Sequence, residues 1–394
     1  MENNSRDSLV YYVWLSMQTG ISYISRLRLL QQYGSAEELY KAAQKTEPAA
    51  EKKLAAVSLD AAAGVIEKCR QQNIIPIPLN SPLYPKRLAC IDDPPFVLYV
   101  KGSLQDFDAL PSVALIGTRK ASVYGHKMAV KLGYETAAQG GVIVCGISGG
   151  IETACVEAAL KAKKDSVIGV LGTAHENAGS SIHRNVLSQG TLISEYPPGD
   201  LPHKSNFRAR NRIASALSLS VCVIEAPEQS GTMLFVSDAV NQGKELFAVP
   251  GNADSDNCRG SNALLKEGAR PVTEAWDFLS YYEGQFPGRI KHLSRDELRI
   301  DESAKKGVVH LNSRKIEKTI DKSESRDYTS LKKLPESLTD AEAAVLSAIT
   351  APDTPADVII SASGLPASKA LSALTMLQIK GRVRQSPGKR FTVL

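Results

Sequence analysis

The sequence has 394 residues, a length that predicts two or three domains, since a typical domain has about 150 residues. Its hydrophobic fraction of 43% and charged fraction of 23% are those of a globular protein and exclude a largely disordered chain. The net charge of +5 is only mildly basic, so bulk charge by itself does not indicate a nucleic-acid-binding protein.

Cysteine usage and hydropathy indicate where such a protein works. The six cysteines are scattered without CxxC spacing, and Cys145 and Cys222 lie in apolar runs, which favours reduced core thiols over a disulfide or zinc framework. The opening stretch MENNSRDSLVYYVW lacks the features of a signal peptide, and no apolar run approaches the length of a membrane span. We therefore expect a cytoplasmic protein without membrane contact.

Residues 1–75 are predicted to form a small helical domain of the SAM or helix-hairpin-helix kind. Apolar residues recur at helical spacing, and Ser35 and Glu38 have the spacing of a capping box. The Thr-Gly-Ile junction at residues 19–21 is either a turn that offers N–H groups to phosphate or a plain packing module, and the second interpretation is favoured. A proline-rich connecting segment with the extended stretch FVLYV follows.

Residues 76–287 have the pattern of a Rossmann-like domain, an α/β fold with a doubly wound parallel sheet. Short apolar runs alternate with helical stretches, which is typical of a parallel sheet covered on both faces. The expected strands cover residues 113–117, 142–146, 167–172, 192–195, 219–226 and 245–251. Ligands of such sheets bind beyond the carboxyl ends of the strands, so functional residues are expected directly after each strand.

Two of the loops after these strands have anion-binding chemistry. Glycine allows a ligand to approach the backbone closely, and a helix N-terminus offers free N–H groups to an anion. The candidates after the first strand, in GTRKASVYG, are Gly117, Thr118, Arg119, Ser122, Tyr124 and Gly125. The candidates after the fifth strand, in EAPEQSGT, are Ser230, Gly231 and Thr232. Neither loop has a dinucleotide or P-loop fingerprint, which disfavours dinucleotide and NTP binding.

A helix predicted over residues 206–217 is rich in arginine, and no acidic residue occurs between Asp200 and Glu225. At about 100° per residue, one face of this helix is polar, with Arg210 at its border. The residues of the polar face are Arg208, Asn211, Arg212 and Ser215. Guanidinium groups prefer bidentate contact with phosphate oxygens, so this face is predicted to bind phosphate; a solvated basic stripe is the alternative.

The chemistry near these loops favours binding over catalysis. No metal-ligand spacing, nucleophile elbow or paired acid and base is present, so we expect neither an enzyme nor a cofactor. Glu195 and Glu225 follow strands and are expected to be structural caps or loop acceptors. Several anion-binding loops along one sheet edge fit a polyanion better than a mononucleotide, because a polyanion offers several phosphates.

Five motifs occur in an order that resembles the DNA-processing protein A (DprA/Smf) family: DDPPFVLYVKG, VALIGTRKASVYG, RARNRIASALS, VIEAPEQSGT and FAVPGNADSDNCRGSNALLKEGA. The resemblance covers about residues 80–275. It implies a single-stranded-DNA-binding protein that protects incoming DNA, loads the RecA recombinase in natural transformation, works as a homodimer and has no catalytic activity. It also implies which residues bind DNA. The DNA-phosphate contacts would be Arg119, Arg210, Asn211 and Arg212, with Lys204 and Phe207 beside them and Phe207 able to stack on a base.

The chain departs from the family pattern in one loop and at two single positions, Arg208 and Phe235, the latter standing where a threonine commonly follows the SGT turn. Where family members usually have SGxAxGIDxxAH, this chain has CGISGGIETACV, with Ser148, Glu152 and Val156 in place of Ala, Asp and His. Gly146 is retained and is expected to line the DNA site. Arg208 stands where proline is usual and adds charge to the predicted binding helix.

The C-terminal part is predicted to contain a linker and a winged helix. Residues 288–333 are dense in charges of both signs and predict a flexible linker, with a non-specific nucleic-acid arm as the alternative. Residues 334–394 predict three helices and a hairpin turning at residues 387–388, the first helix starting at Thr339 and Glu342 in capping-box spacing. The cations of the hairpin are Arg382, Arg384, Lys389 and Arg390. The hairpin contacts either DNA or a protein, and the sequence favours neither.

Three hypotheses for the function follow. The first is a single-strand binder and recombinase loader, which the basic loops and the family resemblance favour. The second is a nucleotide-processing enzyme on a Rossmann-like fold, which would need paired carboxylates or a PGGxGT-type loop that the sequence lacks. The third is a winged-helix regulator, which would bind duplex DNA in a sequence-dependent manner.

Overall fold

The computed structural model describes residues 2–18, 20–45, 54, 57–294, 296–298, 338–352, 354–380, 382–386 and 390–393. It divides into two compact units, residues 1–306 and 307–394. Most of the predicted linker lies outside the described residues, as do residue 19 of the predicted N-terminal turn, the hairpin turn at residues 387–388 and Lys389. Among the described helices, none is long and apolar enough to cross a membrane.

The N-terminal residues form a helical layer within the first unit. Its helices are α1 (Glu2–Ser16), α2 (Tyr23–Tyr33), α3 (Ala36–Gln44) and α4 (Leu59–Gln71). Ser35 caps α3 by accepting a hydrogen bond from the N–H of Glu38, as its spacing predicts. The indole N–H of the fully buried Trp14 donates to the backbone oxygen of Val57 at 2.9 Å, which ties α1 to the chain before α4.

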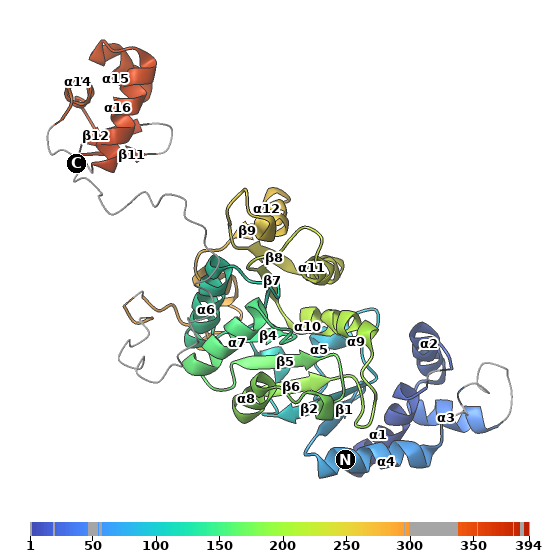
Figure 1. Ribbon diagram of the computed structural model, residues 1–394. Coiled ribbons are helices and arrows are strands. Elements are labelled where there is room, and N and C mark those ends of the chain that lie inside the picture. Colours follow the sequence, from blue (N-terminus) through green and yellow to red (C-terminus); the bar gives the residue numbers. More distant parts are fainter. Residues whose placement is uncertain are drawn as a thin grey trace, which may run out of the picture. The chain divides into compact units, whose positions relative to one another are not determined.

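A nine-stranded sheet forms the centre of the first unit (Figure 1). Its strands are β1 (Ile75–Pro78), β2 (Val97–Gly102), β3 (Ser112–Ile116), β4 (Val142–Cys145), β5 (Val167–Leu171), β6 (Thr191–Ser194), β7 (Ser220–Val223), β8 (Glu245–Ala248) and β9 (Arg270–Pro271). The order is β1-β2-β6-β5-β4-β3-β7-β8-β9, and all pairs from β6 to β9 are parallel. The predicted doubly wound parallel sheet is therefore confirmed.

Three strands of this sheet, β1, β2 and β9, were not expected from the sequence, and β2 is the longest of them. The stretch FVLYV, predicted as part of a connecting segment, contains most of β2, which pairs antiparallel with both β1 and β6. Leu98 and Val100 pack into the core of the sheet domain, whereas Val97 and Tyr99 pack against the N-terminal helices. Because both faces of β2 are covered, its apolar run is continuous rather than alternating.

Helices cover both faces of the sheet. One face carries α6 (Val123–Ala138), α7 (Ile151–Ala162), α8 (Ser181–Gln189) and α13 (Trp276–Leu279). The other carries α5 (Lys86–Ala89), α10 (Asn211–Leu217), α11 (Gly231–Asn241) and α12 (Arg259–Lys266). Short 3-10 helices are η2 (Phe107–Ala109), η3 (His175–Asn177), η4 (Asp256–Cys258) and η5 (Ser280–Tyr282). Along β3, Val113 and Leu115 enter the first core and Ala114 and Ile116 the second, as the two-residue period of a strand requires.

The chain reverses its winding beside β3. It runs outward through β4, β5 and β6, then returns through α9 (Lys204–Ala209) and α10 to place β7 on the other side of β3. Such a reversal opens a crevice at the carboxyl ends of the two central strands, where Rossmann-like proteins bind ligands.

The second unit has the architecture of a winged helix. It contains α14 (Asp340–Ser347), α15 (Ala356–Ser363), α16 (Ala367–Ile379) and a sheet of β10 (Thr354–Pro355), β12 (Arg390–Val393) and β11 (Val383–Ser386), paired in that order. The predicted capping box is present, since Thr339 and Glu342 exchange hydrogen bonds at the start of α14. The winged-helix prediction is confirmed.

Candidate nucleic-acid interface

A pocket of about 450 Å³ lies at the carboxyl ends of β3 and β7 and brings together the three predicted segments. It is lined by Ile116, Gly117, Thr118, Arg119, Ser148, Glu152, Lys204, Phe207, Arg208, Arg210, Asn211, Ser230, Gly231, Thr232, Leu234 and Phe235. We call it the switch-point pocket. Of the predicted site residues, Ser122, Tyr124, Gly125, Gly146 and Arg212 do not line it.

Arg119 stands on a loop that is tightly held by its neighbours. The N–H of Thr118 donates to the backbone oxygen of Glu225 at 2.7 Å, and the N–H of Ile151 donates to the oxygen of Thr118 at 3.2 Å. A Cβ at Gly150, where φ is +56°, would lie 2.5 Å from Cα of Arg119, so α7 approaches the loop closely. The side chain of Arg119 is exposed and forms no hydrogen bond or ion pair with any residue that the structure describes.

The N-terminus of α6 does not face the pocket as an open anion site. The N–H and the hydroxyl of Ser122 donate to the carboxylate of Glu225 at 2.8 and 2.6 Å. The N–H of Gly125 donates to the hydroxyl of Ser122 at 3.0 Å. Ser122 is the N-cap of α6, and Glu225 is a loop acceptor, one of the two roles predicted for it. The carboxylate of Glu225 lies where the sequence analysis expected a phosphate. The ring of Tyr124 is 45% exposed, and its hydroxyl donates to the oxygen of Pro250 at 2.8 Å.

Arg210 is a buried cation at the bottom of the pocket, with an exposed fraction of 3%. Its guanidinium donates to the backbone oxygen of Val170 and, at 2.9 Å, to the hydroxyl of Ser148, while its Nε has no partner among the described residues. Burial lowers the pKa of Arg210. A Cβ at Gly146 would lie 1.9 to 2.1 Å from the guanidinium atoms, so Gly146 makes the space that this side chain occupies.

The predicted helix over residues 206–217 is interrupted at Arg210, and that prediction is wrong in this respect. The chain forms α9 and α10 instead, with Arg210 between them. Arg210 keeps right-handed helical backbone angles, but its side chain donates to the oxygen of Val170 at the end of β5, and Ser215 lies in the interior with no exposed surface. Of the other predicted polar-face residues, Arg208 is exposed, whereas Asn211 and Arg212 are partly buried, so the polar face is present only in part.

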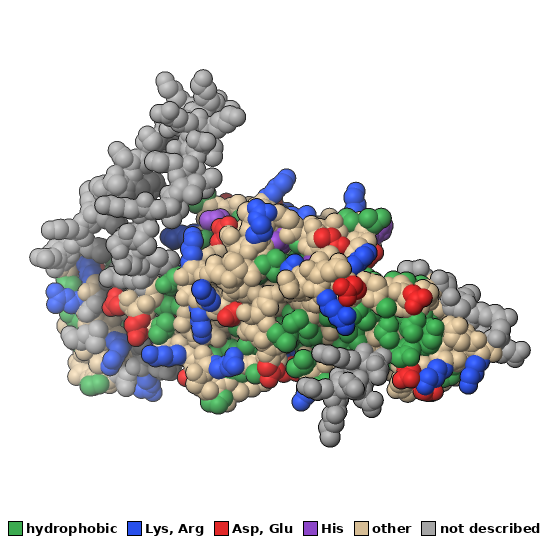
Figure 2. Space-filling model, turned by 90° about the horizontal axis from the view of Figure 1, so that it is seen from below, with side chains coloured by type: hydrophobic (Ala, Val, Ile, Leu, Met, Phe, Trp, Pro, Cys, Tyr) green, Lys and Arg blue, Asp and Glu red, His purple; other side chains and the backbone are tan. Residues whose placement is uncertain are grey.

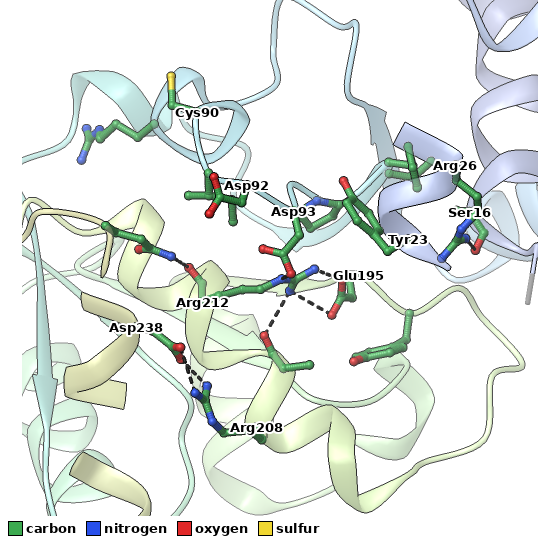
Figure 3. A pocket seen from close by; sticks show the side chains of 18 of the residues that line it. Ser16, Tyr23, Arg26, Cys90, Asp92, Asp93, Glu195, Arg208, Arg212 and Asp238 are labelled. Carbon is green, nitrogen blue, oxygen red and sulfur yellow. Dashed lines mark hydrogen bonds and ion pairs between the residues drawn. The ribbon is translucent and has the colours of Figure 1, made fainter. Parts of the chain in front are cut away.

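The expectation that the arginines lack carboxylate partners is wrong for Arg212 and Arg208. Figure 3 shows Arg212 between Asp93 and Glu195, which it contacts at 2.7 Å each, and Arg208 facing Asp238. Burial acts to lower the pKa of Arg212, but Glu195 and Asp93 outweigh it and raise the pKa above its usual value. These carboxylates lie 119, 17 and 30 residues from their partners in the sequence, beyond the reach of any local pattern.

Arg212 belongs to a different cavity. It lines a groove of about 1010 Å³ between the N-terminal helices and the α9–α11 region, together with Arg26, Tyr23 and Lys244. Arg208 lines both this groove and the switch-point pocket. The three arginines of the sequence motif therefore have three different environments.

Phe207 and Lys204 project from α9 on the rim of the switch-point pocket. Lys204 is exposed and has no hydrogen bond or ion pair to another described residue. Phe207 is 44% exposed, and its backbone and ring pack over Gly172, where an added Cβ would meet both at 3.1 Å. An aromatic side chain with this exposure is accessible for stacking.

The N-terminus of α11 is open to the pocket. Ser230 is its N-cap, but the side chain makes no capping bond, and the buried hydroxyl has no partner among the described residues. The first N–H groups of a helix have no intrahelical acceptor, so those of Gly231 and Thr232 are available to an anion. Of the two predicted phosphate cradles, only this one is unoccupied by the protein's own carboxylate.

Sequence reasoning missed part of the lining. Ser148 and Glu152, noted only as departures from a family pattern, line the pocket, and the carboxylate of Glu152 accepts a hydrogen bond from the N–H of Ser148 at 2.8 Å. The surface outside the pocket carries charges of both signs. On the face drawn in Figure 2, Lys and Arg side chains are interspersed with Asp and Glu side chains. The described residues contain no group of His, Cys, Asp and Glu that could hold a metal ion.

A family model described as DNA recombination-mediator protein A matches residues 76–283, and a model of the DprA winged helix domain matches residues 330–389. The chain is 36% identical to the DNA processing protein DprA of Bacillus subtilis over 221 residues, which cover 55% of this chain and 73% of the relative. It is 27% identical to protein Smf of Synechocystis over 333 residues, covering 83% and 82%. The X-ray structure of DNA processing protein A from Streptococcus pneumoniae superposes with a TM-score of 0.59 at 28% identity, covering 69% of this chain and 97% of that one.

Proposed function

This chain belongs to the DNA recombination-mediator protein A family, and we propose that it binds single-stranded DNA in the switch-point pocket. The observation that carries the proposal is the lining of the pocket. Arg119 and Lys204 are cations without a hydrogen bond or ion pair to another described residue. They line one cavity together with the buried cation Arg210 and the open N-terminus of α11. Together they offer charge and N–H donors to a phosphate backbone.

The aromatic rim supports a single strand over a duplex. Phe207 presents an exposed ring directly beside the cations, and base–aromatic stacking needs a base whose face is not already covered by its neighbours. Stacking and phosphate contacts are tolerant of sequence, because every base has a π-face and every nucleotide a phosphate. We therefore propose binding without strong sequence preference.

Each residue of the predicted site has a role in this proposal. Arg119, Lys204 and Asn211 contact the DNA backbone, and Ser230, Gly231 and Thr232 bind a phosphate at the start of α11. Gly117 and Thr118 form the floor beside Arg119. Arg208 contributes charge from the rim, whereas Gly146, Ser122 and Gly125 support the site from behind, and Tyr124 lies outside the pocket. Arg212 stabilises the fold through its ion pairs.

The wider role that we propose follows the family. The chain would protect incoming DNA and load RecA recombinase during natural transformation, acting in the cytoplasm as a homodimer and without catalysis. The description of the matching family model, a recombination mediator, supports this role.

The winged helix gives little support to the alternative of a sequence-specific regulator. Of the described side chains of α16, only Lys369 is a cation, while Leu371 is 44% exposed. Helices that read the major groove carry several polar or basic side chains toward the bases. Two exposed arginines, Arg382 and Arg384, lie instead on β11 and its approach.

The test compares fluorescence anisotropy of a labelled oligo(dT) strand and a duplex of equal length over a series of salt concentrations. We expect tighter binding of the single strand and a steep decrease of affinity with salt. Arg119→Ala should weaken single-strand binding about tenfold with an unchanged melting temperature, since a charge-assisted contact contributes about 1.5 kcal/mol or more. Lys161→Ala, which removes an exposed cation at the far end of α7, is the matched control. Preference for the duplex, or equal affinities of Arg119→Ala and wild type, would contradict the proposal.

A further inference from the structure

A single residue holds both ends of the loop that carries Arg119. The backbone oxygen of Glu225 accepts a hydrogen bond from the N–H of Thr118 at 2.7 Å. Its carboxylate accepts two more, from the N–H and the hydroxyl of Ser122 at 2.8 and 2.6 Å. Arg119 lies between these two attachment points, so the path of its backbone depends on Glu225.

Glu225 is a buried carboxylate, 1% exposed, that forms no ion pair with any described residue. Burying such a charge is unfavourable unless hydrogen bonds and dipoles compensate for the lost water. Ser122 supplies two donors, the thiol of Cys258 lies 3.7 Å from Oε1, and the positive end of the α6 dipole faces the carboxylate. The charge is therefore stabilised by the same loop that it holds.

The carboxylate also closes the first anion site of the crevice. The N-terminus of α6 follows β3 at the point where the winding reverses, a position at which Rossmann-like folds bind phosphate. A Cβ at Gly125 would lie 2.4 Å from Oε2 of Glu225, so the carboxylate is packed directly against the first turn of the helix. A ligand phosphate cannot reach this turn unless Glu225 leaves it.

We infer that Glu225 is a positioning residue for DNA binding: its carboxylate acts as a built-in anion that holds the 118–122 loop and directs Arg119 into the switch-point pocket. The inference rests on the proposed function and extends it to a residue that never touches DNA. The backbone phosphate is thereby left to Arg119 and to the open N-terminus of α11.

The test is a double-mutant cycle on the affinity for oligo(dT), using Arg119→Ala, Glu225→Ala and the double variant. Each single change should weaken binding about tenfold, and the double variant should also be weakened about tenfold, because Glu225 acts only through Arg119. A double variant weakened about a hundredfold, the product of the two single effects, would overturn the inference. So would a folded Glu225→Ala protein with wild-type affinity.

Two further variants serve as controls. Glu228→Ala removes a negative charge from the same loop, but Glu228 is exposed and has no hydrogen bond or ion pair to another described residue. The affinity of this variant for oligo(dT) should therefore stay within about twofold of wild type. Glu225→Gln keeps an oxygen that can accept from the Ser122 N–H and an amide that can donate to its hydroxyl, so it should lose less affinity than Glu225→Ala. A Gln variant as weak as the Ala variant would contradict positioning by these hydrogen bonds.

If Glu225→Ala does not fold, Ser122→Ala replaces it in the cycle, because this change removes one hydrogen bond to the carboxylate and leaves the buried charge in place. We expect a loss of about threefold alone and none in the Arg119→Ala background, and an equal loss in both backgrounds would overturn the inference. A failure of the proposed function can be distinguished from a failure of the inference about Glu225. An Arg119→Ala variant without any loss contradicts the proposed function, whereas additive losses contradict only the role of Glu225.

Discussion

Arg119 and Arg212 are both expected from the sequence to bind phosphate, yet their surroundings are opposite. Arg119 is exposed and has no hydrogen bond or ion pair to another described residue, whereas the side chain of Arg212 is 13% exposed and contacts two carboxylates. The carboxylate partners of Arg212 come from the segment before β2 and from the end of β6. The density of arginines in a segment thus does not tell which of them are free, because carboxylates distant in the sequence decide that.

Because Arg119 and Arg212 differ in exposure and in ion pairing, they have different roles. An exposed cation without a partner contributes little to folding and keeps its hydrogen-bonding capacity for a ligand. A largely buried cation between two carboxylates has its donors occupied, and removing Arg212 leaves the largely buried charge of Glu195 without compensation. Arg119 belongs to the proposed binding surface, and Arg212 belongs to the framework beneath it.

Of the proposed substitutions, Arg212→Ala should have the largest effect. We expect the free energy of unfolding to fall by about 3 kcal/mol, because the largely buried carboxylate of Glu195 loses its partner, whereas Asp93, 44% exposed, is hydrated. Urea unfolding followed by circular dichroism measures the change. Arg119→Ala is the reference variant and should stay within about 0.5 kcal/mol of wild type. Equal stabilities of the two variants would refute the assignment of Arg212 to the framework.

Gly146→Ala should have a smaller effect, on the third arginine of the comparison. The new Cβ would fall within 1.9–2.1 Å of the Arg210 guanidinium and displace it, which should lower the free energy of unfolding by about 1–3 kcal/mol. Gly179→Ala is the control, since an added Cβ there meets nothing within 4 Å. Differential scanning calorimetry of both variants is sufficient. A Gly146→Ala protein as stable as wild type would show that the Arg210 side chain can adopt another position without loss of stability.

The substitution Phe207→Ala tests the proposed stacking of this ring on a DNA base and has the smallest expected effect. Loss of one stacking partner should weaken binding of oligo(dT) about fivefold, or about 1 kcal/mol, and leave the folding stability unchanged. Leu201→Ala removes a more exposed apolar side chain, 81% exposed, that does not line the pocket, and should not change the affinity. Phe207→Tyr, which keeps the ring, should bind like wild type. Parallel losses in the Phe207 and Leu201 variants would argue against a specific stacking platform.

Much of the fold was predictable because its signals are local. The continuous apolar runs of the parallel strands and the capping box at Thr339 depend on residues a few positions apart. The antiparallel strand β2 escaped prediction because its burial depends on the N-terminal helices that cover its second face. The break between α9 and α10 was not predicted either; at this point Arg210 donates to the oxygen of Val170 at the end of β5, 40 residues away in the sequence.

The site was predictable in its location but not in its details. The rule that ligands bind at the carboxyl ends of parallel strands brought the loops after β3 and β7 together correctly. Which groups remain free there is decided by contacts between distant segments. Ser122 is hydrogen-bonded to Glu225, 103 residues away in the sequence, and Arg212 is hydrogen-bonded to Asp93, 119 residues away. No pattern within one segment contains that information.

Hydrogen–deuterium exchange of the full chain with and without oligo(dT) tests the central claim most directly, because it compares the two sides of α9 and α10 in one experiment. We expect slower exchange on DNA binding in residues 117–122, 204–211 and 230–234, which contribute to the switch-point pocket, and unchanged exchange in residues 90–97, which line the Arg212 groove. Protection of residues 90–97 without protection of residues 117–122 would contradict the account.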